Sequence, residues 1–139
     1  MPGYSEKLDP TQGDIDNVLA AIVASEEGSG RMAGYQPYSI LLSDDDGQPV
    51  IGGLYGYQLF DWLFIQYLGV PASMQGKGVG QELMARAEAW ARGRGLAGMW
   101  LDTFAFQARP FYEKLGFSVF GEIEDHPRGS SRYFLNKRF

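Results

Sequence analysis

Apolar side chains recur with two different periods along this chain, and the periods separate helices from strands. Between residues 15 and 23 they follow the i, i+3, i+4, i+7, i+8 spacing of a helix packed on one face, directly after Asp14. The Gly-Ser-Gly sequence at 28–30 is expected to end this helix. A short strand is expected before it, around Tyr4 to Leu8.

Strand-forming sequence dominates the next part of the chain. Residues 38–42 and 50–59 are rich in β-forming side chains and flank the sequence Ser-Asp-Asp-Asp-Gly-Gln-Pro, which predicts an antiparallel hairpin. Trp62 to Val70 is apolar at nearly every position, which indicates a central strand covered on both faces. Pro71 ends this strand.

The second half of the chain alternates helices and strands. Residues 81–92 carry apolar side chains on one side, and Gly93 and Gly95 end the helix that they predict. Further elements are expected as strands at 97–102, 117–124 and 132–137 and as a short helix at 108–115. Strand, helix and strand between 63 and 102 imply a parallel pair with a right-handed crossover. The pattern predicts an α/β (α+β) fold with a mixed, twisted β-sheet flanked by helices.

Length and composition narrow the chemistry. At 139 residues the chain is expected to form a single domain, 1–139, that buries its own core. It has no cysteine and one histidine, His126, which excludes a thiolate zinc site, a cysteine nucleophile and a histidine-rich metal centre. No metal site is expected.

Charge and hydropathy bear on partners and location. The 17 acidic and 12 basic residues give a net charge of −5, which argues against nucleic acid because phosphate contacts need clustered Lys and Arg. The N-terminus lacks a basic region followed by an apolar segment, and no uncharged stretch reaches the roughly 18 to 20 residues of a membrane span. The sequence therefore predicts a cytoplasmic protein with no membrane partner.

The sequence Gln-Gly-Lys-Gly-Val-Gly at 75–80 lies between the apolar strand and the helix that follows it. Gly76, Gly78 and Gly80 let the backbone approach a ligand and adopt positive φ, while the first helical N–H groups favour an anion. This turn predicts a phosphorylated cofactor. A P-loop would place Ser or Thr after Lys77, where Gly78 stands, and a dinucleotide fold would have its glycine turn near the first strand.

Three motifs together resemble the GNAT superfamily of acyl-CoA-dependent N-acyltransferases. They are Leu-Gly-Val-Pro at 68–71, the glycine turn at 75–80, and Ala-Arg-Pro-Phe-Tyr-Glu-Lys-Leu-Gly-Phe at 108–117. The resemblance covers about residues 50–125. It implies the GNAT fold, with a splayed central parallel strand pair, and an N-acetyltransferase that moves acetyl from acetyl-CoA directly to a primary amine in a ternary complex.

The resemblance also implies roles for residues around the cofactor. The Leu68 amide is expected to bind the acyl carbonyl, and Val70 to pair with the pantetheine arm. Gln107 is expected to replace the family's usual pantetheine-holding Asn, which would fall at Ala105. Backbone contacts to the pyrophosphate of coenzyme A are expected from Gln75, Gly76, Lys77, Gly78, Val79 and Gly80.

The motifs assign the general acid more clearly than the general base. Tyr112 matches the family's general acid, which protonates the departing thiolate. The glutamate that some members use as a base would fall near Phe64, where no carboxylate stands. Asp102 is the first choice for the base, and Asp61, His126 or a water chain are the alternatives.

The acceptor is the least defined partner. The region expected to bind it, 9–37, is short, which favours a small-molecule amine, and the resemblance leaves a homodimer open. A groove lined by aromatic side chains would favour an aromatic or cationic acceptor. Aromatic residues expected near the groove are Tyr35, Tyr38, Tyr55, Tyr57, Phe60, Trp62, Tyr67, Phe104 and Phe106. Two other classes of function stay open: a non-catalytic acyl-CoA-binding module, and an interaction subunit that assembles through the aromatic sheet.

Overall fold

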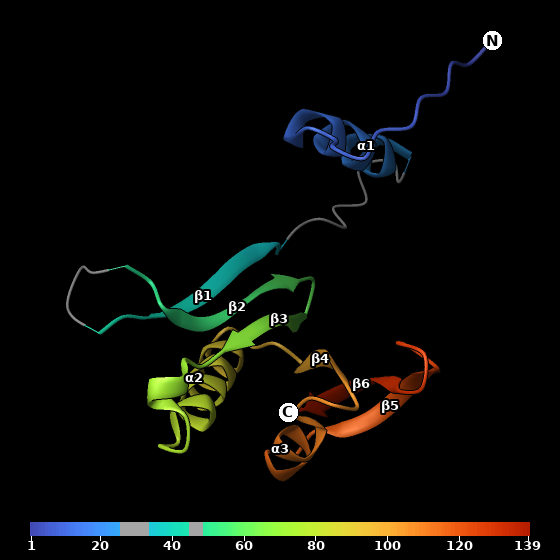
Figure 1. The fold of residues 1–139 in the computed structure, drawn as a ribbon. Coiled ribbons are helices and arrows are strands. Elements are labelled where there is room, and N and C mark those ends of the chain that lie inside the picture. Colours follow the sequence, from blue (N-terminus) through green and yellow to red (C-terminus); the bar gives the residue numbers. More distant parts are fainter. Residues whose placement is uncertain (26–33, 45–48) are drawn as a thin grey trace. The chain divides into compact units, whose positions relative to one another are not determined.

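The chain forms two compact units, Met1–Ala33 and Gly34–Phe139. The computed structural model describes residues 1–25, 34–44 and 49–139. The smaller unit contains α1 (Gln12–Ser25), and the larger unit contains the other described helices and strands (Figure 1). Among the described residues, no helix is both long and apolar enough to span a bilayer. A single domain over residues 1–139 stays a prediction.

Reciprocal hydrogen bonds fix the start of α1. Thr11 Oγ1 accepts a hydrogen bond from the Asp14 N–H, and Asp14 Oδ2 accepts one from the Thr11 N–H, both at 3.0 Å. This capping box confirms the helix and starts it before Asp14. The strand predicted around Tyr4 to Leu8 is wrong, because a strand needs a neighbour for its backbone groups and the described part of this unit offers none. α1 ends at Ser25, and the sequence expected to end it, 28–30, lies outside the described residues.

The larger unit is built on a six-stranded mixed sheet with the order β1-β2-β3-β4-β6-β5. Its strands are β1 (Gln36–Leu42), β2 (Gly52–Leu59), β3 (Trp62–Gly69), β4 (Gly98–Phe104), β5 (Ser118–Glu124) and β6 (Ser131–Arg138). β3 and β4 pair in parallel, and every other neighbouring pair is antiparallel. The predicted hairpin, parallel pair and mixed sheet are therefore confirmed.

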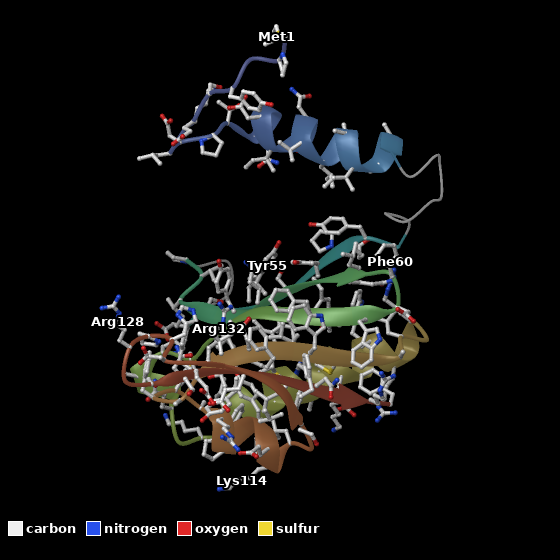
Figure 2. The ribbon with its side chains drawn as sticks, turned by 90° about the vertical axis from the view of Figure 1, so that its right-hand side faces the viewer. Met1, Tyr55, Phe60, Lys114, Arg128 and Arg132 are labelled. Atoms are coloured by element: carbon white, nitrogen blue, oxygen red, sulfur yellow. The ribbon has the colours of Figure 1, made fainter. Side chains whose placement is uncertain are left out.

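One face of this sheet packs against the two α-helices that follow β3 in the chain. The 3-10 turn η1 (Ala72–Met74) leads into α2 (Val79–Gly93), and α3 (Arg109–Lys114) follows β4; α2 and α3 lie on the same side of the sheet (Figure 1). The core between them contains fully buried side chains from β3, α2, β4 and β6: Leu63, Ala87, Met99 and Leu135. In Figure 2, Tyr55 and Lys114 lie on opposite sides of the sheet: Tyr55 on its outer face and Lys114 on α3.

β3 was expected to be covered on both faces, and in the Gly34–Phe139 unit it is buried on one. Leu63 and Ile65 are buried in the core, whereas Trp62 and Phe64 point to the outer face and are partly exposed. The reason is that α2 and α3 both pack on the core face within this unit. The apolar side chains of β3 therefore form two surfaces. One set packs into the core, and the alternate set makes an aromatic outer face of the sheet.

A bulge and a splay separate the end of β3 from its neighbours. Tyr67 pairs with Tyr55 and Ile65 with Gly56, so Gln66 is an extra residue in β3. Gly56 accommodates the close approach, because a Cβ there would collide with the Phe64 carbonyl. A bulge bends its strand, and the parallel pairing with β4 stops in the same place, at Ile65 and its partner on β4. The expected splay of the central parallel pair is thus confirmed.

Candidate active site

The splay opens a cavity of about 300 Å³ between β3 and β4. The cavity lies beyond the last paired residues of the two strands, at the end of β3 that leads into the glycine turn. It is lined by Gln66, Tyr67, Leu68, Gly69, Asp102, Thr103, Gln107, Ala108 and Tyr112. Four residues expected in the site from the sequence are therefore brought together: Leu68, Asp102, Gln107 and Tyr112.

Tyr112 presents a buried phenol to this cavity. It lies on α3 with 9% of its surface exposed, and its ring makes edge contacts with Phe111 and Phe117 at centroid distances of 5.1 and 6.1 Å. Burial, and then the negative charge of Asp102, raise the pKa of Tyr112 to about 12. The phenol is therefore protonated throughout the physiological range and can act as a hydrogen-bond donor.

Asp102 lines the same cavity and is held by a cation that the sequence analysis missed. Arg132 of β6 donates from Nε to Asp102 Oδ1 at 3.0 Å, and its Nη2 forms an ion pair with the same oxygen at 2.8 Å. Oδ2 of Asp102 accepts no hydrogen bond from the described residues, so one oxygen is oriented by Arg132 and the other is open. Arg132 also lies over the rings of Phe104 and Phe134. Only the strand register, which pairs Phe104 with Arg132, could have revealed this contact.

Gln107 is fixed at the wall of the cavity by its side-chain oxygen. Oε1 accepts hydrogen bonds from the Phe104 N–H at 2.9 Å and from Thr103 Oγ1 at 3.2 Å. The side-chain NH₂ group donates to none of the described residues, so it is available to a ligand. Thr103 is 3% exposed and was also missed, although its place next to Asp102 in an alternating strand marks it as inward-facing.

The glycine turn leaves a row of backbone donors uncovered. Gly76 and Gly78 adopt φ of 75° and 78°, as predicted, and neither would bring an added Cβ closer than 3.9 Å to a neighbouring atom. Within the described part of the chain, the N–H groups of residues 76–81 have no hydrogen-bond acceptor. Gln75 anchors the turn to the end of β3, because its Nε2 donates to the Val70 carbonyl at 3.0 Å. Lys77 is exposed.

Gly80 differs from the other two glycines, and the prediction of a positive φ there is wrong. It lies in the first turn of α2, where a Cβ would meet the Phe111 ring at 3.3 Å. A side chain at this position would therefore crowd the contact between α2 and α3. α2 begins at Val79 rather than at Gln81, so the Gly80 N–H is among the free donors of a helix N-terminus.

The other candidates for the base do not line the cavity. Asp61 precedes β3 at the end where β3 and β4 are still paired, roughly 13 Å along the strand from Ile65, the last paired residue before the splay. His126 follows β5, and its ring contacts the Phe104 ring edge-on at 5.4 Å, beside the end of β4. The structure therefore separates Asp61 from the splay and leaves Asp102 as the carboxylate of the cavity.

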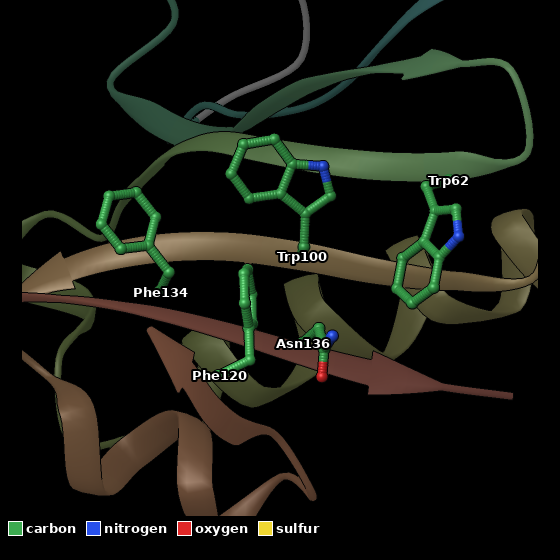
Figure 3. Close-up of a pocket in the computed structure, with 5 residues that line it drawn as sticks. All are labelled: Trp62, Trp100, Phe120, Phe134 and Asn136. Atoms are coloured by element: carbon green, nitrogen blue, oxygen red, sulfur yellow. The ribbon is translucent and has the colours of Figure 1, made fainter. Parts of the chain in front are cut away.

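Aromatic residues expected in one groove divide among several places. Tyr38 stacks on Trp90 of α2 at 4.2 Å and belongs to the helix-covered face. A separate hollow on the outer face is lined by Trp62, Trp100, Phe120, Phe134 and Asn136 (Figure 3). It begins at the paired end of β3 and β4, and it shares no lining residue with the splay cavity. Tyr55 and Tyr67 stack on each other at 6.1 Å beside the splay.

Comparison with known proteins decides the family. The family model described as "Acetyltransferase (GNAT) family" matches residues 13–117. The chain belongs to the GNAT family. An acetyltransferase of Agrobacterium fabrum is 40% identical over 101 residues, which cover 73% of each protein. A blasticidin-S acetyltransferase of Streptomyces morookaense is 40% identical over 87 residues, which cover 62% of this chain and 64% of that protein.

A solved structure extends the similarity to nearly the whole chain. A crystal structure from Agrobacterium tumefaciens, of a protein assigned as an acetyltransferase, is 30% identical and covers 99% of this chain and 100% of its own. Its TM-score is 0.89. This GNAT protein is therefore an acetyl-CoA-dependent acetyltransferase with the GNAT fold, as the motifs at 68–71, 75–80 and 108–117 predict.

Proposed function

We propose that this GNAT protein transfers acetyl from acetyl-CoA directly to the primary amine of a small molecule, with Tyr112 as the proton donor to the departing sulfur. The observation that supports this most is the splay cavity, in which the Tyr112 phenol and the Asp102 carboxylate face the same space beside a turn of free backbone donors. No covalent enzyme intermediate is proposed, since the chain has no cysteine.

The glycine turn and the end of β3 are proposed to hold the coenzyme. Uncovered N–H groups at the start of a helix favour a phosphate, which assigns Gln75, Gly76, Lys77, Gly78, Val79 and Gly80 to the pyrophosphate. The pantetheine arm would then follow Val70, and the free NH₂ group of Gln107 would donate to one of its carbonyls. The Leu68 amide would donate to the acyl carbonyl as it becomes an oxyanion, an interaction worth roughly 3 kcal/mol in other acyl-transfer enzymes.

Protons must balance across the reaction. The acceptor ammonium loses one proton to become the attacking amine and a second proton as the amide forms, while the sulfur of coenzyme A gains one. Asp102 is proposed to accept a proton from the amine, on its way to solvent, through Oδ2, the oxygen that Arg132 leaves open. Tyr112 donates to the sulfur as the C–S bond breaks and regains its proton from solvent. A thiol has a pKa near 8.5, so full proton transfer from a phenol of pKa about 12 is uphill by roughly 5 kcal/mol. The Tyr112 phenolate is therefore short-lived and is quickly protonated again.

A small amine is favoured over a structured protein acceptor by one relative. The enzyme of Streptomyces morookaense is named for acetylation of blasticidin S, a small molecule. The acceptor for this chain is proposed to be a small-molecule amine of that size class.

The test is turnover in a panel of amines. Acetyl-CoA is mixed with the protein and each amine, and free thiol is followed together with the acetylated product. Tyr112→Phe should lower kcat by about a hundredfold, within the usual range for removal of a general acid, and leave the affinity for coenzyme A within about twofold. Unchanged turnover in Tyr112→Phe would reject the role of Tyr112. Binding of acetyl-CoA without turnover on any amine would favour the non-catalytic module instead.

A further inference from the structure

Another hollow on the outer face of the sheet, different from the one in Figure 3, adjoins the splay cavity. It has a volume of about 260 Å³ and runs over the ends of β1, β2 and β3. Gly53 and Gly69 pair across β2 and β3, and neither contributes a side chain to the space above them. Leu41, Tyr55 and Tyr67 stand around these glycines. The hollow extends over Gly69 because this position lacks a side chain, whereas a Cβ at Gly53 would collide with the Ile40 carbonyl of β1.

This hollow is continuous with the cavity in which the thioester is proposed to react. Tyr67 and Gly69 line both spaces. Alternation along the strand places them on the face opposite Leu68, which packs against the core. α2 and its glycine turn belong to the core side. A molecule in the hollow therefore approaches the acyl carbon from the side opposite the coenzyme, as the second substrate of a ternary complex must.

The chemistry of the hollow selects an uncharged group. Its described lining residues are aliphatic side chains, glycines and two tyrosines, with no ionised side chain. The Tyr55 and Tyr67 rings stack with an angle of 26° between their planes, and Gln66 Nε2 donates to the Tyr67 hydroxyl at 3.3 Å. Stacked rings offer flat faces to an apolar or aromatic group, while Asp102, the carboxylate among the described residues that line the two spaces, lies in the splay cavity.

We propose that this hollow, lined by Leu41, Tyr55, Tyr67 and Gly69, binds an apolar or aromatic portion of the acceptor directly next to its amino group. The inference rests on the proposed function, because it places the amine in the splay cavity and the body of the acceptor in the hollow. It makes Gly69 a residue that determines acceptor specificity. The hollow therefore favours amines that carry a ring over short aliphatic amines.

Gly69 provides a direct probe. A Cβ built there meets nothing within 4 Å, and its φ lies outside the left-handed region, so a side chain fits the fold and enters the hollow. Gly93, at the end of α2, is the matched control, because a Cβ there also meets nothing within 4 Å. Leu41→Ala is a second probe, since Leu41 is 62% exposed and its truncation leaves the core intact.

The experiment compares benzylamine with ethylamine, each with acetyl-CoA. In Gly69→Val, the ratio of kcat/KM for benzylamine to that for ethylamine should fall at least about tenfold, as when a pocket loses room for a substrate group. Leu41→Ala should lower the ratio about threefold, and Gly93→Ala should leave it within about twofold of the wild-type value. An unchanged ratio in Gly69→Val, with the variant folded by thermal unfolding, overturns the proposal.

Two further readouts separate this inference from the proposed reaction. Acetyl-, propionyl- and butyryl-CoA are compared in Gly69→Val; a changed preference among them would mean that the hollow holds the acyl chain, which overturns the proposal. Benzylamine is also titrated into the protein loaded with coenzyme A while the Tyr67 amide signal is followed by NMR. A shift in the wild type that Gly69→Val abolishes supports the hollow even if no amine is acetylated, in which case the proposed reaction alone is wrong. No shift in the wild type overturns the hollow.

Discussion

At the scale of single residues, the proton on Tyr112 links the fold to the chemistry. Burial and the charge of Asp102 raise its pKa to about 12, above the value near 10 of a tyrosine in an unfolded chain. Between these two values the folded protein holds a proton that the unfolded chain releases. The stability that depends on this proton is fully present below about pH 10 and is lost as the pH rises towards 12.

This difference predicts an alkaline transition that belongs to one phenol. From about pH 10 to about pH 12, the free energy of unfolding of the wild type should fall by roughly 2 to 3 kcal/mol more than that of Tyr112→Phe. Urea unfolding at a series of pH values measures both. Parallel curves for the two proteins would contradict a buried, protonated Tyr112.

Asp102 is tested against a carboxylate outside the cavity. Asp102→Asn should lower kcat/KM about tenfold to hundredfold near neutral pH, because the amine loses the group proposed to accept its proton. Asp61→Asn is the control and should stay within about twofold of the wild type. The deficit of Asp102→Asn should shrink as the pH approaches the pKa of the acceptor, where the amine is already neutral. A deficit that is equal at every pH would mean that Asp102 only positions Arg132.

At the scale of elements, the connection from β3 to α2 concentrates the features that a phosphate requires. Gly78 is the N-cap of α2 in the left-handed conformation, and the donors that follow it are free. Gly95, just beyond the other end of α2, has nearly the same φ, 75° against 78°, and a Cβ there meets nothing within 4 Å. Gly78 and Gly95 therefore share a strained left-handed backbone, but only Gly78 lies next to the free N–H donors.

Glutamate at these two positions separates strain from ligand binding. Gly78→Glu and Gly95→Glu should each lose roughly 1 kcal/mol of stability, since each forces a side chain into the left-handed region. Only Gly78→Glu should lose affinity for coenzyme A, by at least about a hundredfold, because its charge and bulk oppose a pyrophosphate. Calorimetric titration with coenzyme A measures the difference. Equal affinities in the two variants would place the pyrophosphate elsewhere.

At the scale of the whole molecule, one lysine joins three elements of the larger unit. Lys137 Nζ of β6 donates to Glu88 Oε1 of α2 at 2.7 Å and to the Leu115 carbonyl after α3 at 2.9 Å. Burial raises the pKa of Glu88, but the bonds and charges of Lys137 and Arg92 outweigh burial and lower it below its usual range. The stability from Glu88 is thus present above its unfolded pKa and is lost as the pH falls through the lowered value.

Removal of this lysine should loosen the unit in a pH-dependent way. Lys137→Met should lower the free energy of unfolding by about 1 to 3 kcal/mol at neutral pH, because it leaves two partly buried acceptors unpaired. The loss should narrow as the pH falls through the lowered pKa of Glu88 and this carboxylate takes up a proton. Arg86→Met, which breaks an exposed pair with Glu82 on the same helix, should cost about 0.5 kcal/mol or less. A loss for Lys137→Met no larger than this control would contradict the link.

The sequence by itself determined the order and type of nearly every element in the larger unit, the parallel strand pair, and the glycine turn, and the splay of that pair was implied by the family resemblance. These depend on local causes: the period of apolar residues, the turn preferences of glycine and proline, and short motifs such as residues 75–80. The same local signals misplaced a strand at Tyr4 to Leu8, because strand formation also requires a partner that the chain near it does not offer.

Only the tertiary structure decided which side chains meet. Asp102 and Arg132 are separated by 30 residues and face each other through the register of β4 with β6. The contact of Gly80 with Phe111, and the bulge that places Gln66 at the splay, depend likewise on packing between elements. Local sequence encodes the pleat and the helical face, but register and packing arise from the fit of surfaces that are distant along the chain. For this reason the motifs identify the chemistry, and the folded sheet defines the hollow beside it.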